Sequence, residues 1–149
     1  MNSLAGGDPA GATTSVADGV QWLDNRVAAG FPSPAEDLGG QRVDLTRELV
    51  RHPQATFLLR ARGHSMTGVG ILDGDILVVD RALVPRHQQV VVAVVDGEFT
   101  VKTLWRRDGR VKLQPAHPAY PEIVPTEGQT LEIWGVVTAA IHQFEPCTR

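Results

Sequence analysis

Two side chains near the middle of the chain could together perform chemistry. They are Ser65, in the run GHSM, and Lys102, in the run FTVK. A serine hydroxyl becomes a good nucleophile only when a neighbouring group accepts its proton, and a lysine can accept it only as a neutral amine. A peptide bond between two small residues, Ala29-Gly30, lies upstream. These three parts are what a peptidase that cuts its own chain requires.

Ser65 alone is a weak signal, because serine is a common turn residue. Gly63 permits a sharp turn and lets another chain approach the backbone closely. We do not expect His64 to be the base, because adjacent side chains on an extended backbone point to opposite faces and a base must lie within about 3 Å of the hydroxyl. The backbone N–H groups of His64, Ser65 and Met66 are the candidate donors to a tetrahedral oxyanion.

Lys102 lies in a segment whose alternation places Thr100, Lys102 and Leu104 on one face. A lysine in such a strand is commonly an outward, solvated residue. A role as base requires its face to be covered, because a neutral lysine at pH 7 needs its pKa to fall from about 10.4 by roughly three units. That shift corresponds to roughly 4 kcal/mol of desolvation or like-charge repulsion. We expect a docked segment carrying the scissile bond to supply this cover.

The Ala29-Gly30 bond is small on both sides, so it could enter a tight cleft. Two prolines follow it, at positions 32 and 34, and they predict an extended, accessible connector. The chain between Gly30 and Ser65 is long enough to fold back. An intramolecular bond also has a high effective concentration, which favours cleavage by a modest catalyst.

Composition narrows the class of protein. A chain of 149 residues fits one domain with a modest arm, and its net charge of -3 argues against a free-standing DNA-binding protein. Cys147 is the single cysteine, so no internal disulfide can form, which fits a cytoplasmic protein. We expect no membrane span and no secretory signal. Four histidines, at positions 52, 87, 117 and 142, show no metal-binding spacing with one another or with Cys147, and no cofactor is predicted.

The chain divides into an arm and a β-rich part. Residues 1–19 are rich in small residues and are predicted to be flexible, and residues 20–27 show the spacing of a short, weakly amphipathic turn or helix. Residues 44–51 predict a helix capped by Asp44. Predicted strands follow at 56–61, 76–79, 89–95, 98–105, 110–113 and 131–141, the last one bent near Gly135. Hairpin turns are predicted at Asp96-Gly97 and Asp108-Gly109. This pattern predicts a mostly β fold, a compact curled antiparallel sheet with a flexible N-terminal arm.

Five segments resemble the UmuD branch of the LexA-type Ser-Lys self-cleaving peptidases (peptidase S24): GFPSPAEDLGGQRVDL, HPQATFLLRARGHSM, GILDGDILVVD, VVDGEFTVKTL and LEIWGVV. The resemblance implies that Ser65 is the nucleophile, Lys102 the general base and Ala29-Gly30 the scissile bond. It also implies a homodimer and a curled β domain of the LexA and signal-peptidase type. The expected divisions are an arm (1–29) removed by cleavage, a connector with a short helix (30–54) and a peptidase domain (55–145).

The resemblance further implies a role in the SOS response to DNA damage. A RecA filament on single-stranded DNA would favour self-cleavage, by stabilising the conformation in which the bond lies over the serine. The shortened dimer would then act as accessory subunit of an error-prone Y-family (UmuC-like) translesion polymerase. Strong direct binding to duplex DNA is not expected.

Two departures and two alternatives accompany this resemblance. The first 29 residues are poor in helix signals and do not match the helix-turn-helix domain of LexA-type repressors. Gly68 stands where family members often have an acidic residue. The alternatives are a LexA-like transcriptional regulator without a standard reader domain, and a non-catalytic dimeric binding module in which Ser65 and Lys102 are vestigial.

Two further charged clusters have ordinary structural interpretations. The basic run WRRDGRVK, residues 105–112, could touch DNA or an acidic partner, but a charged hairpin tip commonly serves solubility. Asp73 and Asp75 could suggest a metal, but carboxylates at a turn usually cap the turn itself.

Overall fold

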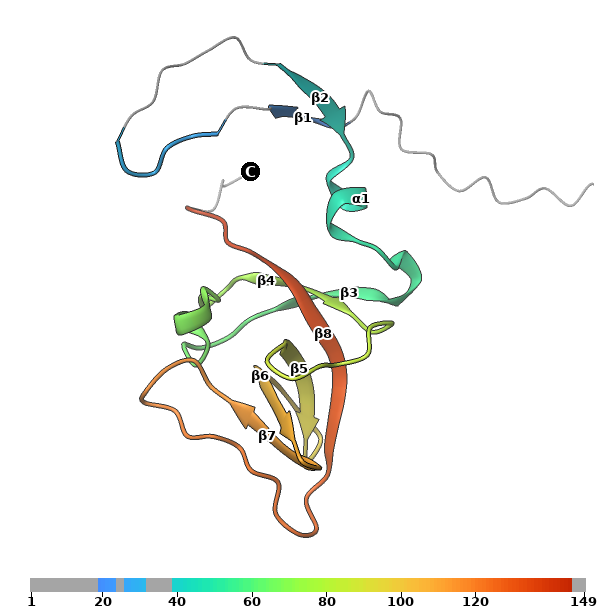
Figure 1. Cartoon of the computed structure of the whole chain (residues 1–149), viewed down its shortest axis with the longest axis vertical. Helices are drawn as coiled ribbons and strands as arrows, with labels where there is room; N and C mark the ends of the chain where they lie inside the picture. The colour runs from blue at the N-terminus through green and yellow to red at the C-terminus, as the bar shows by residue number, and fades with distance from the viewer. Residues whose placement is uncertain (1–18, 24–25, 32–38, 146–149) are drawn as a thin grey trace, which may run out of the picture. The chain divides into compact units, whose positions relative to one another are not determined.

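The computed structural model describes residues 19–23, 26–31 and 39–145 (Figure 1). The chain forms two compact units, residues 1–48 and residues 49–149. The predictions for residues 1–18, for the prolines at 32 and 34, and for Cys147 lie outside the described residues.

The first unit contains a small two-stranded sheet. Strand β1 (Val20–Leu23) pairs antiparallel with β2 (Gly40–Val43), so that Val20 lies opposite Val43 and Leu23 opposite Gly40. The expected turn or helix at residues 20–27 is therefore wrong. Val20 and Trp22 also recur at a spacing of two, which suits a strand. The deciding partner, β2, lies too far along the chain for a local pattern to indicate it.

A short helix follows this sheet, as predicted. Helix α1 (Leu45–Leu49) begins after Asp44, whose Oδ1 accepts a hydrogen bond from the backbone N–H of Thr46 at 2.9 Å. The Asp44 carbonyl also accepts the N–H of Glu48 at 3.1 Å. The side chain and the carbonyl of Asp44 thus satisfy two donors at the start of the helix.

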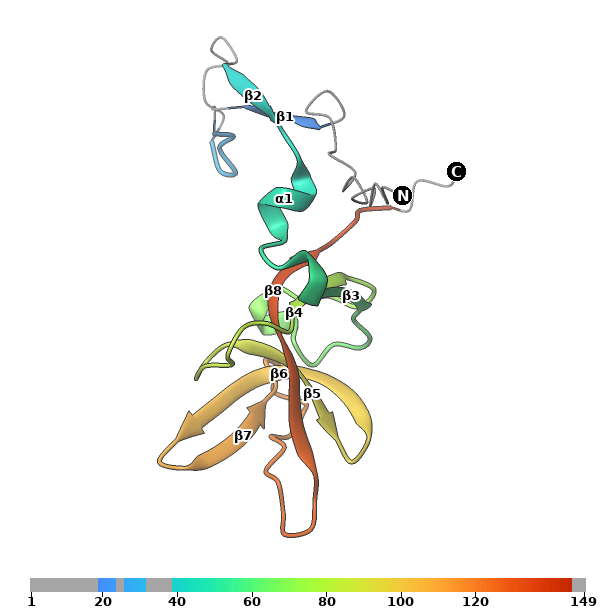
Figure 2. The same cartoon turned by 90° about the vertical axis from the view of Figure 1, so that its right-hand side faces the viewer.

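The second unit is built on a six-stranded antiparallel sheet in the order β3-β4-β8-β5-β6-β7 (Figures 1 and 2). Its strands are β3 (Thr56–Arg60), β4 (Ile76–Asp80), β5 (Val90–Val95), β6 (Glu98–Arg107), β7 (Arg110–Gln114) and β8 (Leu131–Ile141). Two single turns of 3₁₀ helix, η2 (Pro53–Ala55) and η3 (Thr67–Val69), flank β3 and its following loop. The predicted strands and the predicted mostly β, antiparallel fold class are confirmed.

Both predicted hairpin turns have the backbone that their sequences favour. Asp96 and Gly97 have φ values of 47° and 82°, and Asp108 and Gly109 have values of 51° and 73°. Two consecutive positive φ angles define the tight turn whose twist matches that of the flanking strands. These turns fix the register of the β5–β6 and β6–β7 pairs.

The long strand β8 curls the sheet. It pairs with β4 on one side and with β5 on the other, and each pairing contains a register shift, between Val78 and Val79 and between Val92 and Ala93. Bulges of this kind bend a strand and increase its twist. The shift opposite Val92 falls at Gly135, which agrees with the predicted bend.

The curled sheet has a hydrophobic cluster on each face. One cluster is formed by Ala61, Met66, Ile71, Leu77, Val79 and Val92. The other is formed by Val91, Ala93, Leu104, Leu113 and Val136. Because Val91 and Val92 are neighbours on β5 and point to opposite faces, β5 is buried on both sides. In the described part of the chain, no helix is long and apolar enough to cross a bilayer.

Candidate active site

Ser65 lies in the loop between β3 and η3, which is held from several directions. Gly63 has a φ of +89°, a conformation that favours glycine, and its N–H donates to Asp73 Oδ1 at 2.7 Å. The Ser65 carbonyl accepts the N–H of Ala116 at 2.7 Å. The next side chain, Met66, is 2% exposed and packs into the first hydrophobic cluster. The serine is therefore fixed by the backbone on both sides of it.

Lys102 lies on the covered face of β6. It is paired with Val91 of β5, and the next residue on the same face, Leu104, is fully buried. Lys102 itself is only 8% exposed. The sequence left open whether this face was solvated, and the structure shows that it is covered.

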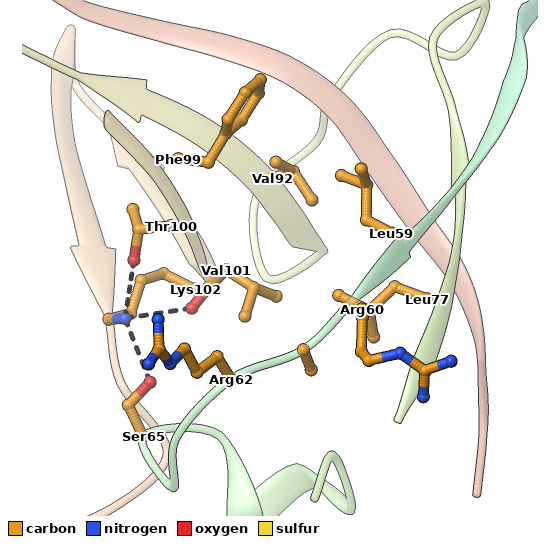
Figure 3. Close-up of a pocket in the computed structure, with 11 residues that line it drawn as sticks. Leu59, Arg60, Arg62, Ser65, Leu77, Val92, Phe99, Thr100, Val101 and Lys102 are labelled. Carbon is orange, nitrogen blue, oxygen red and sulfur yellow. Dashed lines mark hydrogen bonds between the residues drawn. The ribbon is translucent and has the colours of Figure 1, made fainter. Parts of the chain in front are cut away.

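The amine of Lys102 and the hydroxyl of Ser65 are in contact. Lys102 Nζ lies 3.1 Å from Ser65 Oγ, 2.9 Å from Thr100 Oγ1 and 3.1 Å from the Val101 carbonyl oxygen (Figure 3). A neutral amine has two N–H donors and one lone pair. Thr100 Oγ1 and the Val101 carbonyl can accept both donors, which leaves the lone pair for the hydroxyl proton of Ser65.

The surroundings of Lys102 favour its neutral form. Burial lowers the pKa of Lys102 from its ordinary value of 10.5, because the ammonium loses hydration there. The cleft at this site has a volume of about 170 Å³, and its lining includes Arg60 and Arg62 but no carboxylate. Figure 3 shows Arg62 in the same part of the cleft as Ser65 and Lys102.

Backbone donors are available beside Ser65. In the part of the chain that the structure describes, the N–H groups of His64, Ser65 and Met66 donate no hydrogen bond. The next N–H, that of Thr67, donates a hydrogen bond to the His64 carbonyl at 3.3 Å. Free amides next to a nucleophile can stabilise an oxyanion. The side chain of His64 is exposed, and within the described residues it makes no hydrogen bond to Ser65.

The Ala29-Gly30 bond lies in the first unit, in the connection between β1 and β2. Both residues are exposed and form a bend. Val27 and Phe31, close to the bond on either side, are 94% and 91% exposed. A Cβ placed on Gly30 would meet no atom within 4 Å. This backbone is open, as the sequence predicted.

The departure at Gly68 has a structural cause. Its N–H donates to the Ala116 carbonyl at 2.8 Å, and a Cβ at this position would lie 2.5 Å from that same oxygen. The Ser65 loop therefore lies too close to residue 116 for an acidic side chain to enter without a shift of the backbone.

Two buried aspartates have partners that sequence reasoning missed. Asp75 is 1% exposed and contacts His142 Nδ1 at 2.6 Å, and Asp80 is 2% exposed and contacts His52 Nδ1 at 2.6 Å. Turn chemistry alone is therefore a wrong interpretation of Asp75, although Asp73 does cap the loop at Gly63. Sequence spacing gave no signal for either pair. Among the described residues, no group of three or more His, Cys, Asp or Glu side chains could hold a metal.

Known proteins resemble this chain along most of its length. Residues 21–138 match the Peptidase S24-like family. The chain is 48% identical to Protein SamA of Salmonella typhimurium over 118 residues, which cover 79% of this chain and 81% of SamA. It is 44% identical to Protein MucA of Escherichia coli over 131 residues, covering 87% of this chain and 89% of MucA.

A match to a repressor covers a smaller share of the matched protein. The chain is 43% identical to the LexA repressor of Azoarcus sp. over 120 residues, which are 80% of this chain but 59% of that repressor. The family match spans both the Ser65 loop and the strand carrying Lys102. On this extent of similarity, the chain belongs to the Peptidase S24-like family.

Proposed function

We propose that this chain is a self-cleaving serine peptidase in which Ser65 is the nucleophile, Lys102 the general base and Ala29-Gly30 the bond that is cut. The observation that carries the proposal is the 3.1 Å contact between Ser65 Oγ and a buried lysine amine whose pKa burial lowers. Family membership supports the reaction class, and the exposed bend at Ala29 and Gly30 supports the choice of bond.

The reaction begins when the neutral Lys102 amine takes the proton of Ser65 Oγ while that oxygen attacks the Ala29 carbonyl carbon. The resulting oxyanion is stabilised by backbone N–H groups among His64, Ser65 and Met66. When the intermediate collapses, the C–N bond breaks and the Lys102 ammonium protonates the departing Gly30 nitrogen. Water, deprotonated by Lys102, then hydrolyses the ester, which restores Ser65 and leaves a carboxylate on Ala29.

The fragment from residue 30 onward is, in this proposal, the form that acts after DNA damage. A RecA filament on single-stranded DNA promotes the cleavage, and the shortened homodimer serves in the cytoplasm as accessory subunit of a Y-family, UmuC-like translesion polymerase. Residues 1–29 are the arm that is removed, 30–54 the connector and 55–145 the peptidase domain. The match covers 81% of SamA and 89% of MucA but 59% of the LexA repressor, which favours this role over that of a transcriptional regulator.

Incubation of the purified chain at pH 9–10 tests the chemistry. Alkaline solution deprotonates Lys102, so we expect a fragment whose first residue is Gly30, identified by mass spectrometry and N-terminal sequencing. Ser65→Ala and Lys102→Ala should each abolish cleavage with an unchanged circular dichroism spectrum. Lys112→Ala, which alters a lysine on the β6–β7 hairpin, is the matched control and should cleave at the wild-type rate.

Two outcomes would support the competing hypotheses. The non-catalytic binding module becomes the better account if the wild-type chain stays intact in two incubations. One is at pH 10 with the chain alone, and the other is at pH 7 with a RecA filament. Saturable, sequence-specific binding to a duplex operator at physiological salt would support the regulator.

A further inference from the structure

The outer edge of β7 is only partly closed. β7 is the last strand of the six-stranded sheet, and its outer side pairs at one position, where Leu113 and Ile123 exchange two backbone hydrogen bonds of 2.9 Å. The backbone N–H and C=O groups that face one side of an antiparallel strand recur every second residue. The N–H and C=O of Val111 therefore face the same outer side as those of Leu113. Within the described residues these two groups have no partner on that side.

The sequence explains why the chain does not close this edge itself. If the register of the Leu113–Ile123 bridge continued, Pro125 would lie opposite Val111, but among the described residues the pairing stops at the bridge. Proline has no N–H, so it cannot donate to the Val111 carbonyl. A groove of about 480 Å³ lies at this place, lined by Gly109, Arg110, Val111, Lys112, Val124 and Pro125. Its volume is within the range of about 300–1,000 Å³ that is usual for ligand sites.

The groove is positively charged in a chain whose net charge is -3. Arg110 lies directly opposite Arg107 across the hairpin, and Lys112 lies opposite Trp105, so all four side chains share one face. Two like charges in direct cross-strand contact destabilise a sheet. Lys112 has a counter-charge in Glu122, whose carboxylate lies 3.6 Å from its amine. A surplus of positive charge therefore remains on this face.

We propose that this groove binds a short extended peptide that carries carboxylates at alternate positions and adds to β7 as a further strand. Its backbone pairs with the N–H and C=O of Val111. Its carboxylates meet Arg110 and Lys112, which stand two residues apart on one face, and the intervening apolar side chain lies on the other face, beside the half-buried Val111.

The same surface is poorly suited to nucleic acid. Single-stranded binding sites use free aromatic faces for base stacking. The indole of Trp105 already has Lys112 Nζ 4.5 Å from its centroid, and the His87 ring contacts it edge-on at 6.1 Å. The open hydrogen-bonding groups of Val111 match a peptide backbone, whereas a phosphate chain offers no N–H to the carbonyl.

Fluorescence anisotropy with a labelled Glu-Leu-Glu-Leu-Glu peptide tests the proposal on the full chain carrying Ser65→Ala, which separates it from the cleavage chemistry. We expect saturable binding that falls at least tenfold in the double variant Arg110→Glu, Lys112→Glu. Arg51→Glu, an exposed charge reversal of the same kind elsewhere in the second unit, should bind as the parent does. The amide of Val111 should exchange with deuterium more slowly when the peptide is bound.

A peptide methylated on its central backbone nitrogens separates strand addition from simple charge attraction. It keeps its carboxylates but loses its N–H donors, so its affinity should also fall at least tenfold. Equal binding of the methylated peptide, the absence of saturable binding, or displacement of the peptide by oligothymidylate at equal charge would each overturn the proposal.

Discussion

At the level of single residues, the proposed mechanism makes the reactivity of Ser65 depend on the protonation of the Lys102 amine. The stem of Lys102 lies on the apolar face that contains Val91 and Leu104, and its amine lies within hydrogen-bond distance of three oxygens, those of Ser65, Thr100 and Val101. Burial removes hydration from the ammonium, while these contacts keep the amine in one position. The site can therefore hold a lysine that is both oriented and easily deprotonated.

This arrangement predicts the pH profile of self-cleavage. Because burial lowers the pKa of Lys102 below 10.5, the rate should rise with pH as the neutral fraction grows and should level off before pH 10.5. Single-turnover cleavage, followed by gel densitometry between pH 6 and pH 11, measures the profile. A midpoint at or above 10.5 in the wild-type chain would contradict the assigned base.

Gly68 permits a second prediction about a single residue. Gly68→Asp places a Cβ 2.5 Å from the Ala116 carbonyl oxygen, so it should lower the free energy of unfolding by about 1–3 kcal/mol. Urea denaturation monitored by tryptophan fluorescence measures the loss. Gly30→Ala has open space around it and should leave stability unchanged. A fully stable Gly68→Asp protein would mean that the loop and residue 116 separate at little cost.

At the level of elements, the two Asp–His pairs fasten the ends of β4. Asp75 precedes this strand and holds His142, just beyond the end of β8, while Asp80 ends it and holds His52, just before η2. Burial acts to raise the pKa of Asp75. The N–H of Leu72 and the contact with His142 outweigh burial and keep that pKa below 3.8. Both pairs tie segments distant in sequence to one central strand.

Removing one histidine tests this role. His142→Ala should lower the free energy of unfolding by about 1–3 kcal/mol at pH 7, because a buried carboxylate loses a partner. The lowered pKa of Asp75 means that its contribution is present above pH 3.8 and is lost as pH falls through the folded value. The difference from the wild type should therefore shrink below pH 3.8. His64→Ala, an exposed ring, is the control, and an equal loss in both variants would contradict the interpretation.

The strands and tight turns of the second unit were predictable because their causes are local. Asp96-Gly97 fixes a hairpin through its own φ preferences, and the β-branched run from Val90 to Val95 needs no distant information to favour a strand. The pairing of β1 with β2, by contrast, depends on a partner about twenty residues away. Residues 20–27 accordingly gave a misleading helical spacing.

The candidate site was predictable only in part for a similar reason. The identity of Ser65 and Lys102 followed from a family resemblance, and alternation put Lys102 on the same face as Leu104. Whether that face was covered depended on which distant segments lie against it, such as the loop that carries Ser65, and alternation alone does not specify this. The partners of Asp75 and Asp80 could not be inferred either, because His142 and His52 come from remote segments.

At the level of the whole molecule, the two units differ in how much of their strands is buried. Every residue of β1 is exposed, whereas β5 and β8 contribute to the buried clusters on the curled sheet. An isolated pair of short strands is marginally stable in water. The structure thus joins a weakly held sheet to a well-packed domain.

Hydrogen exchange should separate these units. Backbone amides of β1 and β2 should exchange close to the rate of an unfolded chain, while those of β5 and β8 should exchange only as fast as the second unit unfolds. Mass spectrometry of deuterated peptides measures both rates. Comparable protection in both units would show that β1 and β2 are stabilised by more than their own pairing.

If Ala29-Gly30 is the bond that is cut, as we propose, its position between β1 and β2 makes the hydrolysis a one-way event. Once the link is severed, β1 belongs to a free peptide, and four paired residues with exposed side chains hold it too weakly to resist dilution. Loss of this peptide also removes the only strand partner that β2 has among the described residues. A single broken bond thereby uncovers a bare strand edge that the uncut protein does not display.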